Sequence, residues 1–475
     1  MNQHLVRMFA VVLLGFGGVV KPVVAASKPN FLFVIADDMT HRDIGCYGGQ
    51  AHTPNIDKLA TEGMRFTRCF QAAPMCSPTR HNIYTGLYPV KSGAYPNHTF
   101  AKDGTKSIVH YLKRLGYRVA LSGKTHISPK EVFPFEYSGQ KNPEFGKIDE
   151  MFAECAKADT PFCLFACSNE PHTPWNKGDR SRYPVDEVKL PPYLVDTPET
   201  RDGMSRYLAE VTYYDWQVGK LLKLLEKHKL ADNTMVTVVS EQGASLPFGK
   251  WTCYDTGLQS AMVVRWPGKV KAGAVTDAMV EYVDVLPTFV EAAGGKPAKE
   301  LDGRSFLPVL SGEADSHKEL VYGIMTTRGI INGSSTFGIR SVRNEKFKYI
   351  WNFTPEIPFR NACVKSKEFQ SWIRAAEAGD ERAAERVRRY QHRPAEELYD
   401  VSKDPLEWKN LADDPRYAET KSELRAQLDD WMKQQGDKGQ QTEIEAPQHQ
   451  GKNRKKNAGN KAGKSKGRKK RNQKK

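Results

Sequence analysis

Short polar strings hold the residues of this chain that could do chemistry. Asp37 and Asp38 stand side by side after an apolar run, and paired carboxylates offer the hard oxygen ligands that Ca²⁺ or Mg²⁺ requires. His126 and His172 follow two other apolar runs, and histidine is the side chain best suited to proton transfer near neutral pH. Cys76 begins the string CSPTR and adds a sulfur atom. These residue types could bind a metal ion, transfer protons and supply a reactive group. The fold must bring them together for such chemistry.

These strings follow segments that are predicted to be strands. Residues Asn30–Ala36 (NFLFVIA) form a continuous apolar run, as expected for a strand buried on both faces. Four further runs are predicted strands: Tyr117–Ser122, Phe162–Cys167, Met235–Ser240 and Ala261–Trp266. Helices are predicted between them, the longest from about Ser205 to Leu230. Strands that alternate with helices predict an α/β fold, with a large, mainly parallel sheet between two layers of helices.

The polar strings stand where such a sheet would carry a site. In open parallel sheets, functional groups collect just beyond the carboxyl ends of the strands. Candidates follow four different strands: Asp37 and Asp38, Lys124 and His126, His172, and Glu241 and Gln242. We therefore expect these side chains to meet at one edge of the sheet.

The pattern changes after Gly312. Shorter β segments at Ile339–Val342 and Phe347–Phe353 precede a polar helix near Lys365–Tyr390 and a last helix with Leu424, Leu428 and Trp431 on one face. A small C-terminal α+β subdomain is predicted. The expected divisions are residues 1–26, a main domain at 27–311, the subdomain at 312–435 and a tail at 436–475.

Residues 1–26 have the features of a secretory signal. Arg7 gives a positive start, an apolar stretch follows to Val20, and Val24-Ala25-Ala26 suits cleavage before Ser27. An uncleaved membrane anchor is the alternative, but the apolar run is short for a bilayer and Lys21 and Pro22 interrupt it. We expect an exported protein, periplasmic or secreted, or lysosomal if the host is an animal. No later segment is a candidate transmembrane helix.

The formal charge of +15 is concentrated at the C-terminal end. Residues 451–475 contain thirteen Lys or Arg and no Asp or Glu, so they account for all but two of the net positive charges. The remaining body is nearly neutral, and no specific nucleic-acid partner is expected. The Gly-, Asn- and Lys-rich composition predicts a disordered tail. Two interpretations stay open: a solvated segment without a partner, or loose attachment to a polyanion such as sulfated polysaccharide, anionic envelope or nucleic acid.

The eight cysteines show no Cys-x-x-Cys pair and no zinc spacing. If Cys76 is consumed chemically, an odd number remains, and we predict no disulfide framework.

The segment from Cys76 to Gly86 carries a resemblance to a known family. Its pattern, Cys-x-Pro-x-Arg followed after four residues by Thr-Gly, resembles the signature of type I, formylglycine-dependent sulfatases. In that family a formylglycine-generating or anaerobic maturation enzyme oxidises the cysteine to formylglycine. The resemblance implies an alkaline-phosphatase-like fold and a sulfatase that acts on a sulfated saccharide.

The resemblance also implies a metal site, with Ca²⁺ favoured over Mg²⁺. Its ligands would be Asp37, Asp38, residue 76, Glu241 and Gln242. Where the family has Asp followed by Asn or His, this chain has Glu241 and Gln242, which are each one methylene longer than Asp and Asn. The donors remain a carboxylate and an amide oxygen. In the alternative arrangement only one of the two reaches the ion and the other points at the sulfate.

The remaining roles are implied residue by residue. The hydrated aldehyde at position 76 would attack sulfur, and Arg80 would stabilise it. Lys124 and Lys250 would balance the charge of the sulfate together with the metal. His126, in the string GKTH, would bind the sulfate, and His172, in EPHTP, would protonate the leaving group.

The second half of the chain narrows the resemblance. The string GASLPFGK at 243–250 and the segment from Arg393 to Arg416 resemble the N-sulfoglucosamine sulfohydrolase (heparan N-sulfatase) branch. Lys250 stands where that branch has arginine, and a lysine lacks the bidentate fork, so N-sulfated and O-sulfated sugars both stay open as substrates. Two other functions are alternatives: a phosphatase or phosphonate hydrolase of the same superfamily, and a non-catalytic polyanion-binding protein.

Overall fold

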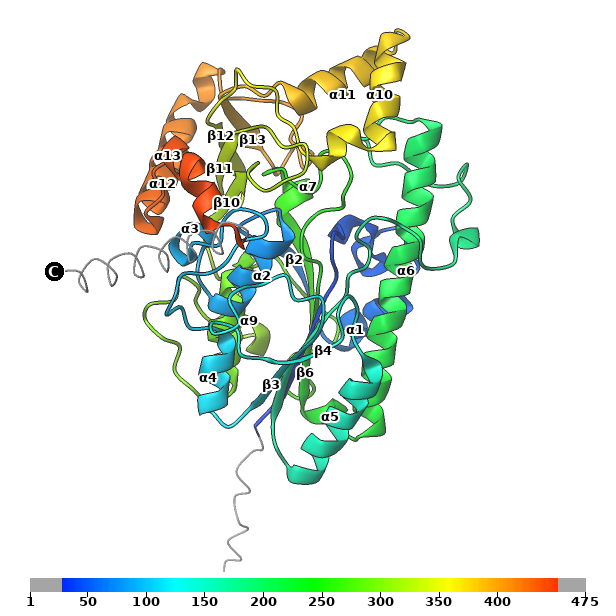
Figure 1. Ribbon diagram of the computed structural model, residues 1–475, viewed down its shortest axis with the longest axis vertical. Helices are drawn as coiled ribbons and strands as arrows, with labels where there is room; N and C mark the ends of the chain where they lie inside the picture. The colour runs from blue at the N-terminus through cyan, green and yellow to red at the C-terminus, as the bar shows by residue number, and fades with distance from the viewer. Residues whose placement is uncertain (1–27, 452–475) are drawn as a thin grey trace, which may run out of the picture.

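A mixed sheet runs through the centre of the computed structural model, which describes residues 28–451 (Figure 1). The predicted signal segment 1–26 and residues 452–475 of the predicted tail lie outside the described residues. The strand order is β4-β3-β5-β1-β6-β7-β2-β8, with β9 paired to β2. The strands are β1 (Asn30–Ile35), β2 (Met64–Phe70), β3 (Arg118–Gly123), β4 (Glu136–Ser138), β5 (Phe162–Cys167), β6 (Thr234–Val239), β7 (Gln259–Arg265), β8 (Ala274–Thr276) and β9 (Val280–Glu281).

Strand β1 lies in the middle of the sheet and is buried along its whole length. It pairs in parallel with β5 and β6, with Phe31 opposite both Cys163 and Met235. Leu32 and Val34 belong to one hydrophobic core, whereas Phe31, Phe33 and Ile35 belong to another. Alternate side chains of a strand point to opposite faces, so the two cores lie on the two sides of the sheet. The run is apolar throughout because both faces of the strand are covered by a hydrophobic core.

Strands β3, β5, β1 and β6 run parallel, as predicted, and β4, which was not predicted, continues this half of the sheet in parallel. The other half of the sheet is mixed. Strand β7 is antiparallel to both β6 and β2, and β2 is parallel to β8 and β9. The alternation in Met64–Phe70 was not among the predicted strands.

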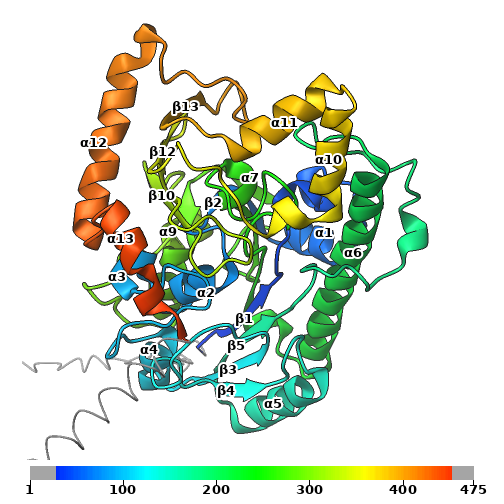
Figure 2. The ribbon, with the colours of Figure 1, turned by 45° about the horizontal axis from the view of Figure 1, so that its top comes forward.

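Helices cover both faces of the sheet (Figure 2). One face carries α1 (Pro54–Glu62), α5 (Phe145–Ala158) and α6 (Pro198–Lys227), and the other carries α2 (Cys76–Thr85), α4 (Ile108–Arg114), α8 (Val285–Ala292) and α9 (Leu307–Ser311). Helix α6 begins seven residues before the predicted start, because Pro198 occupies its first turn and the Thr197 side chain caps it by accepting from Thr200 N. No helix within residues 28–451 has the length and apolar character needed to cross a membrane.

A second, antiparallel sheet forms the C-terminal subdomain. Its strands, in the order β10-β11-β12-β13, are β10 (Val321–Thr326), β11 (Gly338–Arg343), β12 (Phe347–Asn352) and β13 (Glu396–Asp400). Helix α12 (Ala418–Gln435) buries Leu424, Leu428 and Trp431, as predicted. Short helices α3 (Pro89–Ser92) and α7 (Asp255–Leu258) belong to the main domain.

The prediction of a single polar helix near Lys365–Tyr390 is wrong. The chain forms α10 (Lys367–Glu377) and α11 (Glu381–Gln391) instead. Gly379 between them has a φ of +101°, which ends the first helix, and the Asp380 side chain caps the second by accepting from Ala383 N.

The predicted start of the tail at residue 436 is also wrong, because the chain stays folded to Gly451. It forms α13 (Gln440–Glu445) and a 3₁₀ turn, and Gln450 bridges Thr99. The fully buried guanidinium of Arg340 lies 2.5 Å from Asp437 Oδ2 and 2.9 Å from Glu443 Oε1. Arginine keeps its charge in proteins, so its burial requires nearby acids, and residues 437 and 443 supply them.

Candidate active site

Asp37 and Asp38 lie at the carboxyl end of β1 and are fully buried. The chain is fixed there by hydrogen bonds from Ala36 N to Val239 O and from Asp37 N to Glu170 O, both 3.0 Å long. Asp38 has a φ of +64°, in the left-handed region that aspartate tolerates better than most residues. Both carboxylates are therefore held at the carboxyl end of β1, beside the ends of β5 and β6.

Cys76 is the first residue of α2, a helix whose ten residues are all buried. Its Sγ lies 3.3 Å from Asp37 Oδ1, 3.9 Å from Asp38 Oδ1 and 3.2 Å from Lys250 Nζ. Burial raises the pKa of the Cys76 thiol to about 12. A thiol with this pKa carries almost no thiolate at neutral pH, so unmodified Cys76 would be a weak nucleophile.

The predicted metal ligands come together around Cys76. One ligand atom from each of Asp37, Asp38, Cys76 and Glu241 lies within 4.8 Å of the others. Three carboxylates buried together need positive charge, and oxygen donors suit Ca²⁺ or Mg²⁺. Glu241 Oε2 and Gln242 Oε1 are buried and have no hydrogen-bond partner among the described residues. The residues present therefore fit a divalent cation.

Gln242 contacts this cluster through its amide nitrogen, which donates to Asp38 Oδ1 and lies 3.4 Å from Cys76 Sγ. A half-turn of the terminal amide exchanges its nitrogen and oxygen. The same side chain could therefore present its oxygen to a cation held by the carboxylates.

Three cationic side chains border the carboxylates. Lys250 is buried and donates to Asp38 Oδ2 at 2.7 Å; although burial opposes its charge, the Asp38 carboxylate raises the pKa of Lys250. Lys124 pairs with Asp37, and burial lowers the pKa of Lys124 to about 8. Arg80 is fully buried, with Nε 2.5 Å from Glu241 Oε1 and Nη1 donating to Lys124 O at 2.9 Å. Each buried carboxylate of the site thus has a cationic side chain beside it. The same cationic side chains could bind an anionic substrate.

The two predicted histidines stand on the open side. His172 Nε2 lies 3.7 Å from Asp38 Oδ2, its side chain is 32% exposed, and its Nδ1 is 2.6 Å from Thr173 O. His126 follows β3, and its main-chain oxygen accepts from Ser77 Oγ at 3.0 Å. Burial lowers the pKa of both rings; that of His126 lies well below its ordinary value, so the His126 ring is neutral at pH 7.

The structure brings all ten predicted residues into one region and adds two that the sequence interpretation missed. Ser245 donates from Oγ to Asp38 Oδ2 at 2.5 Å, and its position inside the string GASLPFGK was an available signal. His98 Nδ1 lies 3.0 Å from His126 Nε2, and no motif surrounds it.

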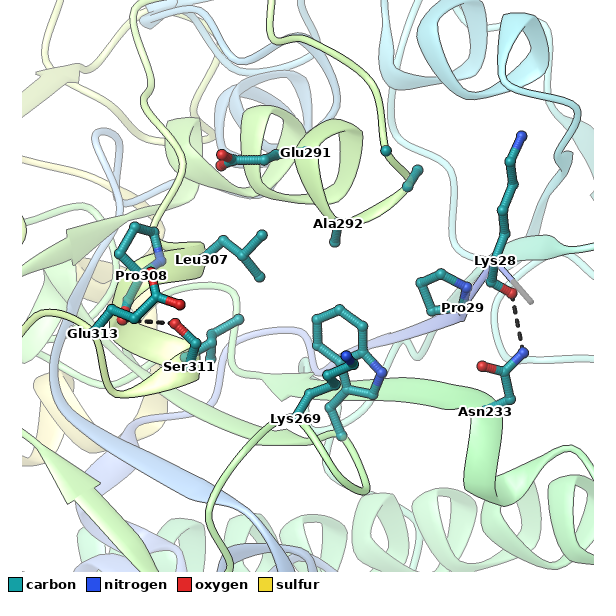
Figure 3. A pocket seen from close by; sticks show the side chains of 14 residues that line it. Lys28, Pro29, Asn233, Lys269, Glu291, Ala292, Leu307, Pro308, Ser311 and Glu313 are labelled. Carbon is teal, nitrogen blue, oxygen red and sulfur yellow. Dashed lines mark hydrogen bonds between the residues drawn. The ribbon is translucent and has the colours of Figure 1, made fainter. Parts of the chain in front are cut away.

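A cavity of about 720 Å³ lies at the opposite edge of the sheet, near the amino ends of β1 and β6 (Figure 3). Lys28, Pro29, Asn233, Trp266 and Lys269 are among its lining residues. None of the predicted site residues lines it. The strand-end cluster, rather than this cavity, carries the candidate chemistry.

Comparisons with known proteins show the family to which the chain belongs. The family model described as Sulfatase matches residues 29–295, and the model described as N-sulphoglucosamine sulphohydrolase, C-terminal, matches residues 243–358. An ulvan-active sulfatase from Formosa agariphila is 36% identical over 426 residues, covering 87% of this chain and 81% of that protein.

Two further matches extend over most of the chain. The N-sulphoglucosamine sulphohydrolase of Homo sapiens is 27% identical over 460 residues, covering 86% of this chain and 90% of that protein. A protein solved in complex with its substrate, D-glucosamine-2-N,6-O-disulfate, has a TM-score of 0.66 at 20% identity and covers 86% of this chain and 99% of its own. At that identity the structural match concerns the fold.

Proposed function

The chain belongs to the sulfatase family, and we propose that it removes sulfate from a saccharide through a hydrated formylglycine formed from Cys76, with Ca²⁺ bound beside it. The family, the alkaline-phosphatase-like fold and the sulfatase activity on sulfated saccharides agree with the sequence prediction. The modification, the ion and the roles of the residues are the proposal.

The position of residue 76 carries this proposal. Its side chain lies within 3.3 Å of both an Asp37 oxygen and the Lys250 ammonium, at the centre of the buried cluster. A nucleophile formed there would already be in place beside the groups that stabilise a sulfate. A thiol with a pKa of about 12 does not fill this role, and a hydrated aldehyde does.

In the proposed reaction one hydroxyl of the hydrate attacks sulfur, and the bond from sulfur to the sugar oxygen or nitrogen breaks. The second hydroxyl then loses its proton, the carbon–oxygen bond to the sulfate breaks, and the aldehyde returns. A water molecule adds to the aldehyde and restores the hydrate. His172 stands at the partly exposed side of the site, where it would deliver the proton that the departing sugar takes up. Lys124 and Lys250 would hold the sulfate oxygens and offset their charge.

Asp37, Asp38, Glu241 and Gln242 would hold the cation, which supplies positive charge to the sulfate oxygens and to the nucleophile. Ca²⁺ accepts six to eight oxygen ligands in flexible geometry, and Mg²⁺ demands a stricter octahedron. The longer side chains of Glu241 and Gln242 suit the more flexible ion. We propose Ca²⁺ for this reason.

The structure disfavours a two-metal phosphatase. Within residues 28–451, both groups of candidate metal ligands share Asp37 and Cys76, so they describe one site. The full set of acids, cations and histidines also argues against a decayed site that only binds polyanions.

Hydrolysis assays with three substrates test the proposal. The protein, with residue 76 examined by mass spectrometry of its tryptic peptide, would be assayed on glucosamine N-sulfate, glucosamine 6-sulfate and a phosphate monoester. We expect an aldehyde at residue 76 and turnover of a sulfated sugar well above that of the phosphate. A plain thiol in protein from the native host, or no turnover with the aldehyde present, would contradict it.

Two substrate classes fit the proposed function, an N-sulfated sugar and an O-sulfated sugar. The C-terminal family match and the human relative support an N-sulfated sugar, whereas the relative from Formosa agariphila is described as ulvan-active. Lys250 in place of the arginine of the N-sulfoglucosamine branch also leaves room for an O-sulfate.

Cys76 is only 3% exposed, so a maturation enzyme could not reach it in the folded protein. We propose that conversion precedes folding, and that residues 1–26, outside the described part of the chain, direct export.

The basic segment 452–475 would attach the enzyme to its sulfated polymer. Gly451, the last described residue, donates from its main-chain nitrogen to His98 O at 3.0 Å, and His98 contacts His126. The described chain therefore ends near the active site, and the thirteen cationic residues follow Gly451 in the sequence. Replacing all thirteen by Gln should weaken heparin binding at low salt at least about tenfold and leave hydrolysis of a monosaccharide sulfate unchanged. Unchanged heparin binding would contradict this role.

A further inference from the structure

A pair of histidine rings stands at the edge of the active site. His126 Nε2 lies 3.0 Å from His98 Nδ1, and the ring centroids are 4.9 Å apart. His126 Nδ1, the other ring nitrogen, is buried and has no hydrogen-bond partner among the described residues. One nitrogen of His126 is thus occupied by His98, and the other is left for a group that the protein does not supply.

His126 is fixed from the side of the nucleophile. Its main-chain oxygen accepts from Ser77, the residue after Cys76, and its φ of +49° lies in the left-handed region. The preceding Lys124 is fixed by Arg80, which donates to its main-chain oxygen. The main chain at His126 is therefore tied to the helix that begins at residue 76.

His98 is fixed from the other side, by the end of the described chain. Its main-chain oxygen accepts from Gly451 N at 3.0 Å. The next two residues also contact this segment: Thr99 Oγ1 donates to His449 O at 3.0 Å, and Phe100 N donates to the same oxygen at 3.2 Å. Gln450 Nε2 donates to Asn97 O at 3.2 Å. The C-terminal segment thus holds the loop that carries His98.

A neutral imidazole carries its proton on one nitrogen, and the hydrogen bond made by the other nitrogen selects which one. If Nδ1–H of His98 donates to Nε2 of His126, the proton of His126 must be on Nδ1. The unpartnered buried nitrogen is then a donor, which is the polarity that a sulfate oxygen requires.

We propose that His98 is a positioning residue that holds His126 in the Nδ1–H tautomer, so that this N–H donates to the sulfate of the bound substrate. This inference rests on the proposed function. His98 acts through His126 and does not itself touch the reacting atoms.

Three variants test the proposal: His98→Ala, His98→Asn and His392→Ala. An asparagine amide can place an N–H close to the position of His Nδ1, so His98→Asn retains the donor. His392 is an exposed histidine after α11 and serves as the matched control. Each variant would be assayed on the sulfated monosaccharide that the unsubstituted protein hydrolyses, and its thermal unfolding would be measured.

We expect His98→Ala to lower kcat/KM at least about tenfold, with unchanged thermal unfolding, because one charge-assisted hydrogen bond to the sulfate is lost. His98→Asn should recover most of the activity, and His392→Ala should match the unsubstituted protein. Equal activity of His98→Ala and the unsubstituted protein would overturn the proposal, as would an equal loss in His98→Asn.

A spectroscopic measurement is independent of turnover. The ¹⁵N shifts of the His126 ring, assigned with a His126→Gln variant, should report the Nδ1–H tautomer in the unsubstituted protein and a mixture in His98→Ala. An unchanged tautomer in His98→Ala would overturn the inference even if the enzyme is active. If no sulfated sugar is hydrolysed, the proposed function fails, and the ring shifts still decide the relation between His98 and His126.

Discussion

The carboxylate of Glu241 takes part in two interactions, one present in the structure and one proposed. It lies 2.5 Å from the buried Arg80, and it also belongs to the group of oxygens that would bind a cation. Although burial opposes its ionisation, Arg80, Lys124 and Lys250 lower the pKa of Glu241, so the carboxylate is charged at pH 7. This one residue therefore links the stability of the site to its proposed metal.

Replacement of Glu241 should affect both properties. Glu241→Gln leaves the Arg80 guanidinium buried without its counterion, and we expect a loss of about 3–5 kcal/mol in the free energy of unfolding. Calcium affinity should fall at least about tenfold, as measured by calorimetry. Glu241→Asp keeps the charge and is the matched control, which should retain most of the stability. Equal unfolding curves for Glu241→Gln and the unsubstituted protein would contradict the role of this ion pair.

His41, in a 3₁₀ turn at His41–Asp43 that follows β1, should make stability depend on pH. Burial, assisted by Arg42, lowers the pKa of His41 to about 3 from its model-compound value of 6.5. Between about pH 3 and pH 6.5 the His41 side chain is protonated in the unfolded chain but not in the folded protein. The contribution of His41 to the free energy of unfolding is therefore complete above about pH 6.5 and is lost as the pH falls towards 3. The slope is at most about 1.4 kcal/mol per pH unit.

Urea unfolding of the unsubstituted protein and of His41→Gln at several pH values measures this term. The difference between the two proteins should shift in favour of His41→Gln as the pH falls from about 6.5. Asp43 in the same turn has a pKa that burial raises to about 6 and contributes with the opposite sign, but it is present in both proteins. A difference that does not change with pH would show that the His41 proton does not contribute.

At the scale of elements, α13 joins the C-terminal subdomain to the segment after α3 that carries Tyr95 and His98. Tyr95 OH donates to Thr442 O at 2.8 Å, and α13 lies beside the segment after α3 in both views of the ribbon (Figures 1 and 2). Asp437 and Glu443, on either side of its start, are the partners of the buried Arg340. This segment is therefore part of the folded subdomain.

Two truncations distinguish this segment from the basic residues that follow. A chain ending at Gly451 should unfold like the full-length protein. A chain ending at Gln435 removes both partners of Arg340, and we expect a loss of about 3–5 kcal/mol in stability. Arg340→Met in the shorter chain should recover part of that loss, because it removes the unpaired charge. Equal thermal stability of the two truncated chains would contradict the assignment.

At the scale of the whole molecule, the proposed cation would couple three regions at the edge of the sheet. It would join the ends of β1 and β6 and the start of α2. An ion that binds the folded state alone stabilises it by mass action.

Chelation should therefore destabilise the entire main domain. At calcium concentrations about a hundredfold above Kd, we expect the free energy of unfolding to exceed that of the chelated protein by about 3 kcal/mol. Calorimetric scans after chelation, and again after adding Ca²⁺ or Mg²⁺, measure the effect. Restoration by Mg²⁺ alone would contradict the choice of Ca²⁺, and no change on chelation would contradict the metal site.

Much of the fold was predictable because its signals are local. The apolar run of β1 follows from burial on both faces, and polar residues directly after strands predicted the edge where the site lies. The mixed half of the sheet was not predictable in this way, because the direction of β7 depends on pairing with strands on both sides of it. Likewise, nothing near Asp437 indicates that Arg340 lies beside it.

The sequence by itself determined the family and the fold class, and it predicted ten residues of the candidate site, because a contiguous motif and strand-end positions indicate them. Only the tertiary structure decided that Lys250 donates to Asp38 from 212 positions away, that Glu241 pairs with Arg80, and that His98 reaches His126. The tertiary structure also decided that residues 437–451 are folded, since the buried Arg340 pairs with Asp437 and Glu443. Such contacts join side chains that are distant along the chain, and no local pattern of residue types encodes them.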